Sequence, residues 1–272
     1  MTVGFETILY AVDGGVATIT LNRPQRHNAF NVQMAGELRT AWESVKRDPA
    51  VVCAIVTGAG DRAFCTGMDI ADVADGSARE EVARVEREQG RPFYAFLTAI
   101  QNRCWKPVIT AVNGMVCGGG LHFIADSDLI VAAEHATFFD THVKVGLIAG
   151  LEPVGLARRM PLEAVLRMAL LGGSERLSAA QAFSLGLVGE LQHPHHLMQR
   201  ARELAAKIAE HSPTALARSK QAIWESLDVG LHEALDRTWQ SIRAHTAHPD
   251  LDEGTKAFVE KRKPRWAPYT AD

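Results

Sequence analysis

Residues 108–126, VITAVNGMVCGGGLHFIAD, decide the fold of this chain. Residues 108–112 form a short apolar run rich in β-branched side chains, which predicts a buried strand. Asn113-Gly114 is a turn signal, and three glycines at 118–120 then precede an apolar segment that suits a buried helix. Because the first N–H groups of a helix lack partners inside it, this order of elements aims backbone N–H groups at a ligand.

The triple glycine has two interpretations. Glycines let a ligand approach the backbone closely, and the helix dipole favours negative charge at this end. These properties indicate a pocket for a phosphate or for an oxygen that gains negative charge during a reaction. Alternatively, the small residues simply allow a helix to pack tightly. The stretch alone leaves both interpretations open.

The composition is that of an ordinary globular protein. The chain has 272 residues, 47% hydrophobic and 22% charged, with a net charge of −3. No basic run dominates and no apolar stretch approaches the roughly 20 residues of a membrane span, so we expect neither nucleic acid nor a membrane as a partner. The four cysteines are scattered and the N-terminus has no signal-peptide pattern. We therefore expect reduced thiols and a cytoplasmic location.

Predicted strands and helices alternate up to about residue 150, which indicates βαβ crossovers and a layered α/β core. The remainder is mainly helical, and its several apolar faces indicate contact between subunits. A charged stretch at 72–89 is expected to be a mobile surface segment that leads into a helix at 91–101. Predicted helix caps are Asn31 and Ser178, and Pro213 is expected in a first helical turn.

Six pieces of sequence in this order and spacing resemble the enoyl-CoA hydratase/isomerase (crotonase) superfamily over nearly the whole chain. Any one piece is a weak signal, but the set is specific. The pieces are NRP (22–24) with Asn28-Ala29, AFCTGMDI (63–70), KPVITAVNGMVCGGG (106–120), SDLIVAAEHATF (127–138), RLSAAQAFSLGLVGEL (176–191) and EGTKAFVEKRKPRW (253–266).

The resemblance implies an α/β fold, a crotonase-like spiral of ββα units over residues 1–200, followed by a C-terminal helical trimerisation region over 201–272. It also implies a homotrimer or a homohexamer made of two trimers. The substrate is then an acyl-CoA thioester, with coenzyme A as part of the substrate and no separate cofactor or metal.

The resemblance also implies an oxyanion hole in which the backbone N–H groups of Met68 and Gly119 hold the thioester oxygen. A lysine is often found in the family at the position of Ala71, so the adenine contact departs from the usual pattern here. Arg26 and the tail lysines are candidates for the CoA phosphates, with solvated surface charge as the alternative. The implied substrate and CoA contacts are Arg26, Ala29, Thr66, Met68, Asp69, Ile70, Ala71, Gly118 and Gly119.

The two catalytic glutamates of the hydratases are replaced here by His122 and His142. Neutral imidazoles accept on one nitrogen and donate on the other, so a water held between two of them still has a base and an acid. His122 is expected in the first turn of a helix, whose dipole disfavours the imidazolium. Asp140, two residues before His142, is placed to orient or charge that ring. A zinc site on the pair lacks a clear third ligand.

Glu152 is a third catalytic candidate, because it lies two residues after a position where some family members place an acidic residue. The alternative is a carboxylate that stabilises a helix N-terminus. The predicted function is hydration or dehydration of an enoyl-CoA by the histidine pair. Isomerisation, decarboxylation, thioester hydrolysis and non-catalytic acyl-CoA binding remain alternatives. A dehydrogenase is disfavoured, because the triple glycine lacks the GxGxxG spacing.

Overall fold

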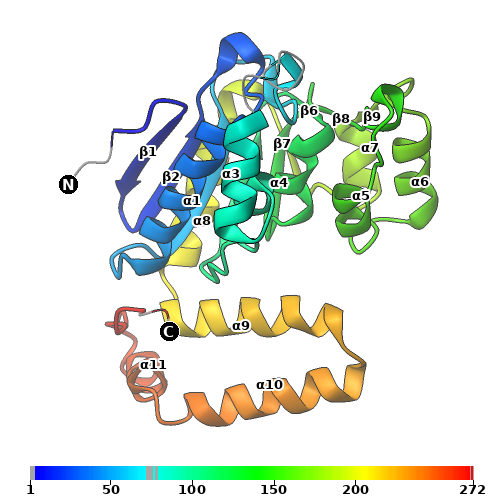
Figure 1. Cartoon of the computed structure of the whole chain (residues 1–272). Coiled ribbons are helices and arrows are strands. Elements are labelled where there is room, and N and C mark those ends of the chain that lie inside the picture. The colour runs from blue at the N-terminus through cyan, green and yellow to red at the C-terminus, as the bar shows by residue number, and fades with distance from the viewer. Residues whose placement is uncertain (1–3, 72–75, 77–78, 270, 272) are drawn as a thin grey trace.

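The computed structural model describes residues 4–71, 76, 79–269 and 271 (Figure 1). Residues 108–125 fold as predicted. Strand β5 (Val108–Val112) is buried throughout and is followed by the short strand β6 (Met115–Cys117). The triple glycine forms the 3-10 turn η3 (Gly118–Gly120), which runs directly into α4 (Leu121–Ala125).

Two sheets make up the α/β body, and the chain alternates between them. The larger sheet is parallel except for the antiparallel pair β1 and β2. The smaller sheet is parallel except that β9 pairs antiparallel with β8. The successive passes β3 to β4, β5 to β6 and β7 to β8 each leave the larger sheet for the smaller one, which is the predicted spiral. The larger sheet has the order β1 (Ile8–Asp13), β2 (Val16–Leu21), β3 (Cys53–Gly58), β5, β7 (Leu129–Ala133), β10 (Glu190–Gln192), and the smaller has β4 (Ala63–Cys65), β6, β8 (Thr137–Phe139), β9 (Leu177–Ser178).

Helices cover both faces of the larger sheet. Helix α1 (Val32–Arg47) begins at Asn31, whose side chain accepts a hydrogen bond from the Met34 N–H at 3.0 Å, so this predicted cap is confirmed. Helix α8 (Leu197–Ala209) packs small side chains, such as Ala201 and Ala205, against the strands from the other side. Coverage on both faces explains why β3 is an uninterrupted apolar run. The boundary predicted between residues 200 and 201 falls inside α8.

The helix predicted at 91–101 is wrong. The helix in this region is α3 (Arg79–Gln89), and only the short turn η2 (Phe93–Phe96) lies within the predicted span. Arg84 contacts Glu81 and Glu88, one helical turn away on each side, which supports α3 despite its weak periodicity. Pro92 disfavours a helical conformation in the residue before it, so α3 does not continue. Residues 72–75 and 77–78 of the predicted mobile segment lie outside the described residues.

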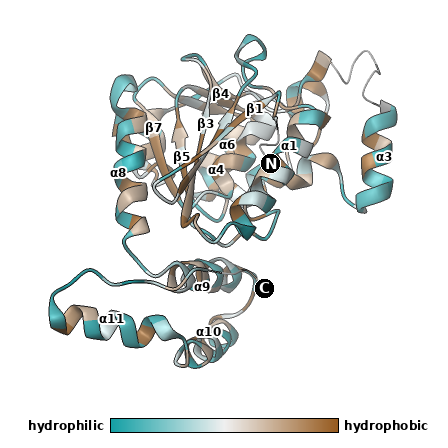
Figure 2. Ribbon diagram, turned by 90° about the vertical axis from the view of Figure 1, so that its left-hand side faces the viewer, coloured by the Kyte–Doolittle hydropathy of each residue, from teal (hydrophilic) through white to brown (hydrophobic). Residues whose placement is uncertain are grey.

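The C-terminal helices form a layer of their own beneath the α/β body (Figures 1 and 2). This layer contains α9 (Pro213–Glu225), α10 (Leu231–His245) and α11 (Pro249–Glu260). Pro213 lies in the first turn of α9 as predicted, and Ser178 makes the predicted cap of α7. The remaining elements are α5 (Leu151–Leu156), α6 (Leu162–Leu170), α7 (Ala179–Ser184), η1 (Pro24–Arg26), η4 (Val143–Val145), η5 (Pro194–His196) and η6 (Ser226–Asp228).

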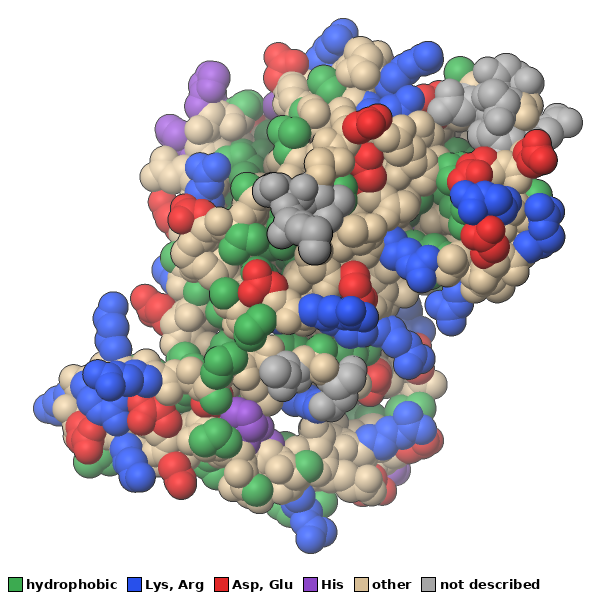
Figure 3. Space-filling model, turned by 60° about the vertical axis from the view of Figure 1, so that its left-hand side comes forward, with side chains coloured by type: hydrophobic (Ala, Val, Ile, Leu, Met, Phe, Trp, Pro, Cys, Tyr) green, Lys and Arg blue, Asp and Glu red, His purple; other side chains and the backbone are tan. Residues whose placement is uncertain are grey.

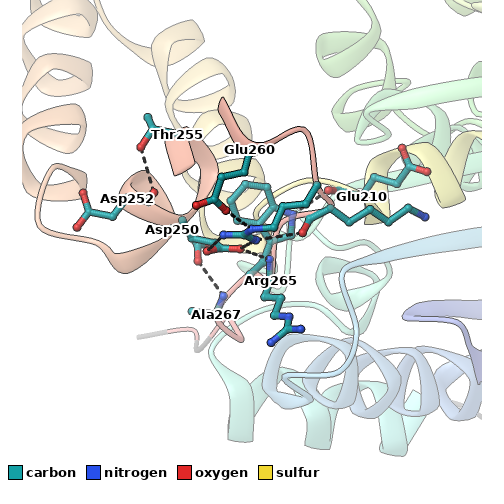
Figure 4. A network of polar contacts seen from close by, with 11 residues as sticks. Glu210, Asp250, Asp252, Thr255, Glu260, Arg265 and Ala267 are labelled. Atoms are coloured by element: carbon teal, nitrogen blue, oxygen red, sulfur yellow. Dashed lines mark hydrogen bonds and ion pairs between the residues drawn. The ribbon is translucent and has the colours of Figure 1, made fainter. Parts of the chain in front are cut away.

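A polar network ties the tail after α11 to the first turn of α11 and to the end of α8 (Figure 4). Asp250 accepts a hydrogen bond from the Ala267 N–H at 2.7 Å, and the Trp266 indole donates to the Glu210 carbonyl at 2.7 Å. On the face drawn in Figure 3, side chains of both charges are interspersed. Among the described residues, no helix is both long and apolar enough to cross a membrane.

Two glycine substitutions are expected to change stability in opposite directions. Gly36 is exposed within α1 and has open space around it, so Gly36→Ala should stabilise the fold by about 0.5–1 kcal/mol. A Cβ on Gly120 would collide with the Cys65 carbonyl oxygen, so Gly120→Ala should destabilise by about 1–3 kcal/mol. Urea denaturation at matched protein concentration measures both, and equal effects of the two substitutions would contradict the tight packing at Gly120.

Candidate active site

Two loops meet where the predicted oxyanion donors lie. Gly67 has a φ of +87°, and a Cβ added to it would lie 2.8 Å from the Gly119 backbone nitrogen and 3.1 Å from the Cys117 carbonyl oxygen. Residues with a Cβ rarely adopt that φ, so the position favours glycine on both grounds. The turn that follows β4 is therefore packed directly on the triple-glycine turn that follows β6.

Phe30 holds the two loops in register. Its N–H donates to the Gly67 carbonyl at 2.8 Å and its carbonyl accepts from the Asp69 N–H at 2.9 Å. These bonds form a parallel bridge between Phe30 and Met68, in which the N–H of Met68 faces the opposite edge. A Cβ on Gly119 would lie 2.8 Å from the Phe30 ring. Gly119 is in the first turn of η3, so its N–H has no partner within that turn.

His142 is held by a buried carboxylate. Asp140 is fully buried and accepts hydrogen bonds from the His142 backbone N–H at 2.8 Å and from Nδ1 at 2.9 Å. The hydrogen bond to Asp140 raises the pKa of His142 above its ordinary value, although burial acts in the other direction. Since Nδ1 donates to the carboxylate, Nε2 is the ring nitrogen that this contact leaves available. The ring borders the glycine turn, because a Cβ on Gly118 would lie 3.7 Å from His142 Cε1.

His122 and Glu152 form a second buried pair. Nε2 of His122 lies 3.1 Å from Oε1 of Glu152, and Nδ1 lies 3.4 Å from Nε2 of Gln101. Burial alone would raise the pKa of Glu152, but the hydrogen bond from His122 and the charge of His142 lower it below its ordinary value. The charge of Glu152 in turn contributes to the raised pKa of His142. The structure thus brings all three predicted catalytic residues within electrostatic reach of one another.

The predicted CoA contacts fall into two groups. Arg26, Ile70 and Ala71 are exposed, whereas Asp69 is buried and its carboxylate lies 2.9 Å from Nη2 of Arg23. The Asp69 side chain is thus engaged within the protein. Ala29 is buried and its carbonyl accepts from Arg23, while Gly118 is buried and the half-buried Thr66 donates to the His27 carbonyl at 3.4 Å.

The cysteines next to the site are unsuited to nucleophilic attack. Burial raises the pKa of Cys65 to about 12 and also raises the pKa of Cys117, whose sulfur lies 3.4 Å from the Thr141 hydroxyl. The reactive form of cysteine is the thiolate, which such pKa values disfavour. In the part of the chain that the structure describes, no three His, Cys, Asp or Glu side chains are grouped so as to hold a metal ion.

Sequence reasoning missed Gln101, Arg23 and Phe30 as supporting residues. Gln101 lies in an irregular segment with no periodic pattern, so nothing local connects it to His122. Arg23 belongs to the quoted NRP motif, whose match gave no role to the side chain. Phe30 follows the Asn28-Ala29 match directly, and a large apolar residue there was the one available signal.

Replacing Asp140 by asparagine should lower the pKa of His142 toward its ordinary value. A raised pKa in the folded state adds stability below the ordinary histidine pKa, and this contribution is lost as pH rises through the raised value. The stability difference between wild type and Asp140→Asn should therefore be largest in mild acid and shrink toward alkaline pH. NMR titration of His142 measures the pKa, with Asp61→Asn, on an exposed loop, as the control. An unchanged titration of His142 in Asp140→Asn would contradict the assigned contact.

Known proteins are similar to this chain over nearly its whole length. The family model described as enoyl-CoA hydratase/isomerase matches residues 11–268. The chain is 35% identical to the (E)-benzylidenesuccinyl-CoA hydratase of Thauera aromatica, over 93% of this chain and 96% of that protein. It is 36% identical to the 1,2-epoxyphenylacetyl-CoA isomerase of Escherichia coli K12, over 96% and 98% of the two chains.

A solved structure supports the same assignment. The crystal structure of an enoyl-CoA hydratase/isomerase from Mycobacterium paratuberculosis aligns with a TM-score of 0.87 and 40% identity, over 97% of this chain and 98% of that one. This likeness confirms the predicted crotonase-like α/β fold. The family match over nearly the whole chain shows that the protein belongs to the enoyl-CoA hydratase/isomerase (crotonase) family and is an enzyme of the hydratase/isomerase type.

Proposed function

We propose that the protein adds water to, or removes it across, the C2–C3 double bond of an enoyl-CoA thioester. The observation that carries this proposal is the presence of two imidazole–carboxylate units within electrostatic reach of each other. Asp140 with His142 forms one, and His122 with Glu152 forms the other. Hydration needs two acid–base groups, one for the water and one for C2, so two such units suit it.

The thioester oxygen is proposed to bind between the N–H groups of Met68 and Gly119. Attack at C3 moves electrons onto this oxygen, which gains negative charge. Fixed N–H dipoles stabilise that charge without reorganising, and removing one such donor typically costs about 3 kcal/mol. The contact between the Gly67 and Gly119 loops and the bridge to Phe30 support this placement.

The proton transfers balance when His142 and the Glu152–His122 unit act on opposite sides of the bond. In dehydration, the Glu152 carboxylate removes the C2 proton, the enolate forms at the thioester oxygen, and His142 donates a proton to the departing hydroxyl group. Hydration is the reverse, with neutral His142 taking the proton of water and the protonated Glu152 returning one to C2. The raised pKa of His142 and the lowered pKa of Glu152 suit the acid and base roles of dehydration.

Double-bond isomerisation is the second candidate, because it needs a single acid–base group on the same enolate. The relative from E. coli is named as an isomerase, which favours this alternative. Decarboxylation, thioester hydrolysis and non-catalytic binding of an acyl-CoA are the other outcomes that an assay must separate. We propose coenzyme A as part of the substrate, with no separate cofactor.

A homotrimer, or a pair of trimers, is proposed as the assembly. Exposed apolar side chains on α10, namely Leu231, Leu235, Trp239 and Ile242, recur at helical spacing and support a subunit contact there. We propose a cytoplasmic location, which the four buried free thiols support.

The proposal predicts hydration of crotonyl-CoA, followed as loss of the conjugated thioester absorbance, with 3-hydroxyacyl-CoA as product. Removing an acid–base group should lower kcat by about 10²–10⁴-fold, so His142→Ala and Glu152→Gln should both fall in that range. His135→Ala should retain activity, because His135 is exposed and its ring hydrogen-bonds to the Asp61 carbonyl, away from both imidazole–carboxylate units. A panel that includes cinnamoyl-CoA covers bulkier acyl chains.

Product analysis separates the alternatives. A shifted double bond indicates isomerisation, free CoA thiol indicates hydrolysis, and carbon dioxide indicates decarboxylation. Binding of CoA thioesters without turnover on any chain would leave only the non-catalytic role. Turnover like that of the wild type in both His142→Ala and Glu152→Gln would remove the proposed acid–base pair from the mechanism.

A further inference from the structure

The side-chain amide of Gln101 has only one possible orientation. Its oxygen accepts hydrogen bonds from the backbone N–H groups of Leu97 at 2.8 Å and Thr98 at 3.2 Å. N–H groups cannot bond to an amide nitrogen, so this side of the amide must be the oxygen. The NH₂ group therefore faces the other way, toward Nδ1 of His122 at 3.4 Å.

This orientation determines which nitrogen of His122 carries the proton. The Gln101 NH₂ group only donates, so Nδ1 must present its lone pair. Nε2 then carries the hydrogen and donates it to Oε1 of Glu152, 3.1 Å away. In an imidazolium, the Nδ1–H would face the N–H groups of the amide, and two donors cannot form a hydrogen bond with each other. Both ring nitrogens are thus occupied by protein partners, and neither is left to accept a proton from water.

We infer that Gln101 is a positioning residue that holds His122 as the neutral Nε2–H tautomer, so that His122 orients Glu152 and Glu152 is the group that exchanges a proton with the substrate. The catalytic consequence rests on the proposed function, whereas the tautomer does not. His122 would then be a fixed hydrogen-bond donor at a position where the resemblance expected an acid–base residue.

The packing of α4 and α5 explains how a carboxylate from a different helix reaches His122. A Cβ on Gly155 would lie 3.0 Å from the Ala125 Cβ, so glycine allows the two helices to approach closely. Glu152 lies in the first turn of α5, one turn before Gly155, and is buried against α4. A carboxylate from α5 is thus brought against the imidazole at position 122 of α4.

Other charged groups around His122 are already engaged. Asp126, at the end of α4, accepts a hydrogen bond from the Thr98 hydroxyl at 2.6 Å, and burial raises its pKa. Arg159 lies within electrostatic reach of Asp126 and donates to the Ala125 carbonyl at 3.1 Å. The charge of His142 lowers the pKa of Glu152. A substitution at Gln101 should therefore leave the partners of these charged groups unchanged.

The test uses Gln101→Glu, which keeps an oxygen for the Leu97 and Thr98 N–H groups but replaces the donor facing His122 with an acceptor. Nitrogen-15 NMR of the full-length protein identifies the tautomer, and His122→Gln assigns the signal. We expect wild type to show a protonated Nε2 and a bare Nδ1, and Gln101→Glu to show a protonated Nδ1. A protonated Nδ1 in wild type, or no change in the variant, overturns the inference.

Activity provides the second readout. In Gln101→Glu, kcat should fall at least about tenfold with little change in KM. This loss is a part of the roughly 10²–10⁴-fold that an acid–base group contributes to kcat. The acid limb of the pH profile of kcat should also shift. Asn102→Leu is the matched control, because Asn102 donates to the Phe96 and Thr98 carbonyls of the same segment without a contact to His122. An equal kcat loss and pH shift in Asn102→Leu would reduce Gln101 to a structural role.

The two readouts separate failure of this inference from failure of the proposed function. If no enoyl-CoA is turned over but the wild-type signal shows the Nε2–H tautomer and the variant changes it, the function is wrong and the role of Gln101 stands. If hydration occurs and the tautomer is the opposite one, the function stands and the role of Gln101 is wrong.

Discussion

The structure depends on a close approach between two loops that contain no room for a Cβ. Gly67 lies against the Gly119 nitrogen, Gly119 lies against the Phe30 ring, and Gly120 lies against the Cys65 carbonyl. This contact is possible because β4 and β6 are parallel neighbours in the smaller sheet, so that both loops begin at the carboxyl ends of adjacent strands. The spiral brings the two segments together, and glycine then sets how close they come.

Around this contact the protein uses the same chemical pair twice, with opposite roles. In one unit a buried carboxylate, Asp140, orients an imidazole, His142. In the other, an imidazole, His122, orients a carboxylate, Glu152. The first unit therefore presents a ring nitrogen and the second a carboxylate oxygen. In the proposed mechanism the site therefore has one acid–base group of each kind, an imidazole and a carboxylate.

The sequence predicted the elements whose signals are local. The apolar run before the triple glycine and the caps at Asn31 and Ser178 have short-range causes, and the structure has them where expected. The helix predicted at 91–101 failed because the helix lies earlier, at Arg79–Gln89, where Val82 and Val85 pack against the core. Gly90, with a φ of +64°, and Pro92 separate it from the predicted span.

Side-chain partnerships across elements were harder to predict. Glu152 had two competing interpretations, a helix N-terminal carboxylate and a catalytic acid, and it lies both in the first turn of α5 and against His122. The orientation of Gln101 depends on the backbone of an irregular segment that no pattern describes. Such contacts join residues 21 to 30 positions apart and follow from packing, which composition and spacing do not specify.

The most direct measurement is a crystal structure of the protein with a bound enoyl-CoA or a non-reactive analogue. The account predicts the thioester oxygen within about 2.7–3.1 Å of the Met68 and Gly119 nitrogens, with C2 and C3 between Glu152 and His142. A thioester oxygen bound elsewhere, or the two N–H groups directed apart in that complex, would contradict it.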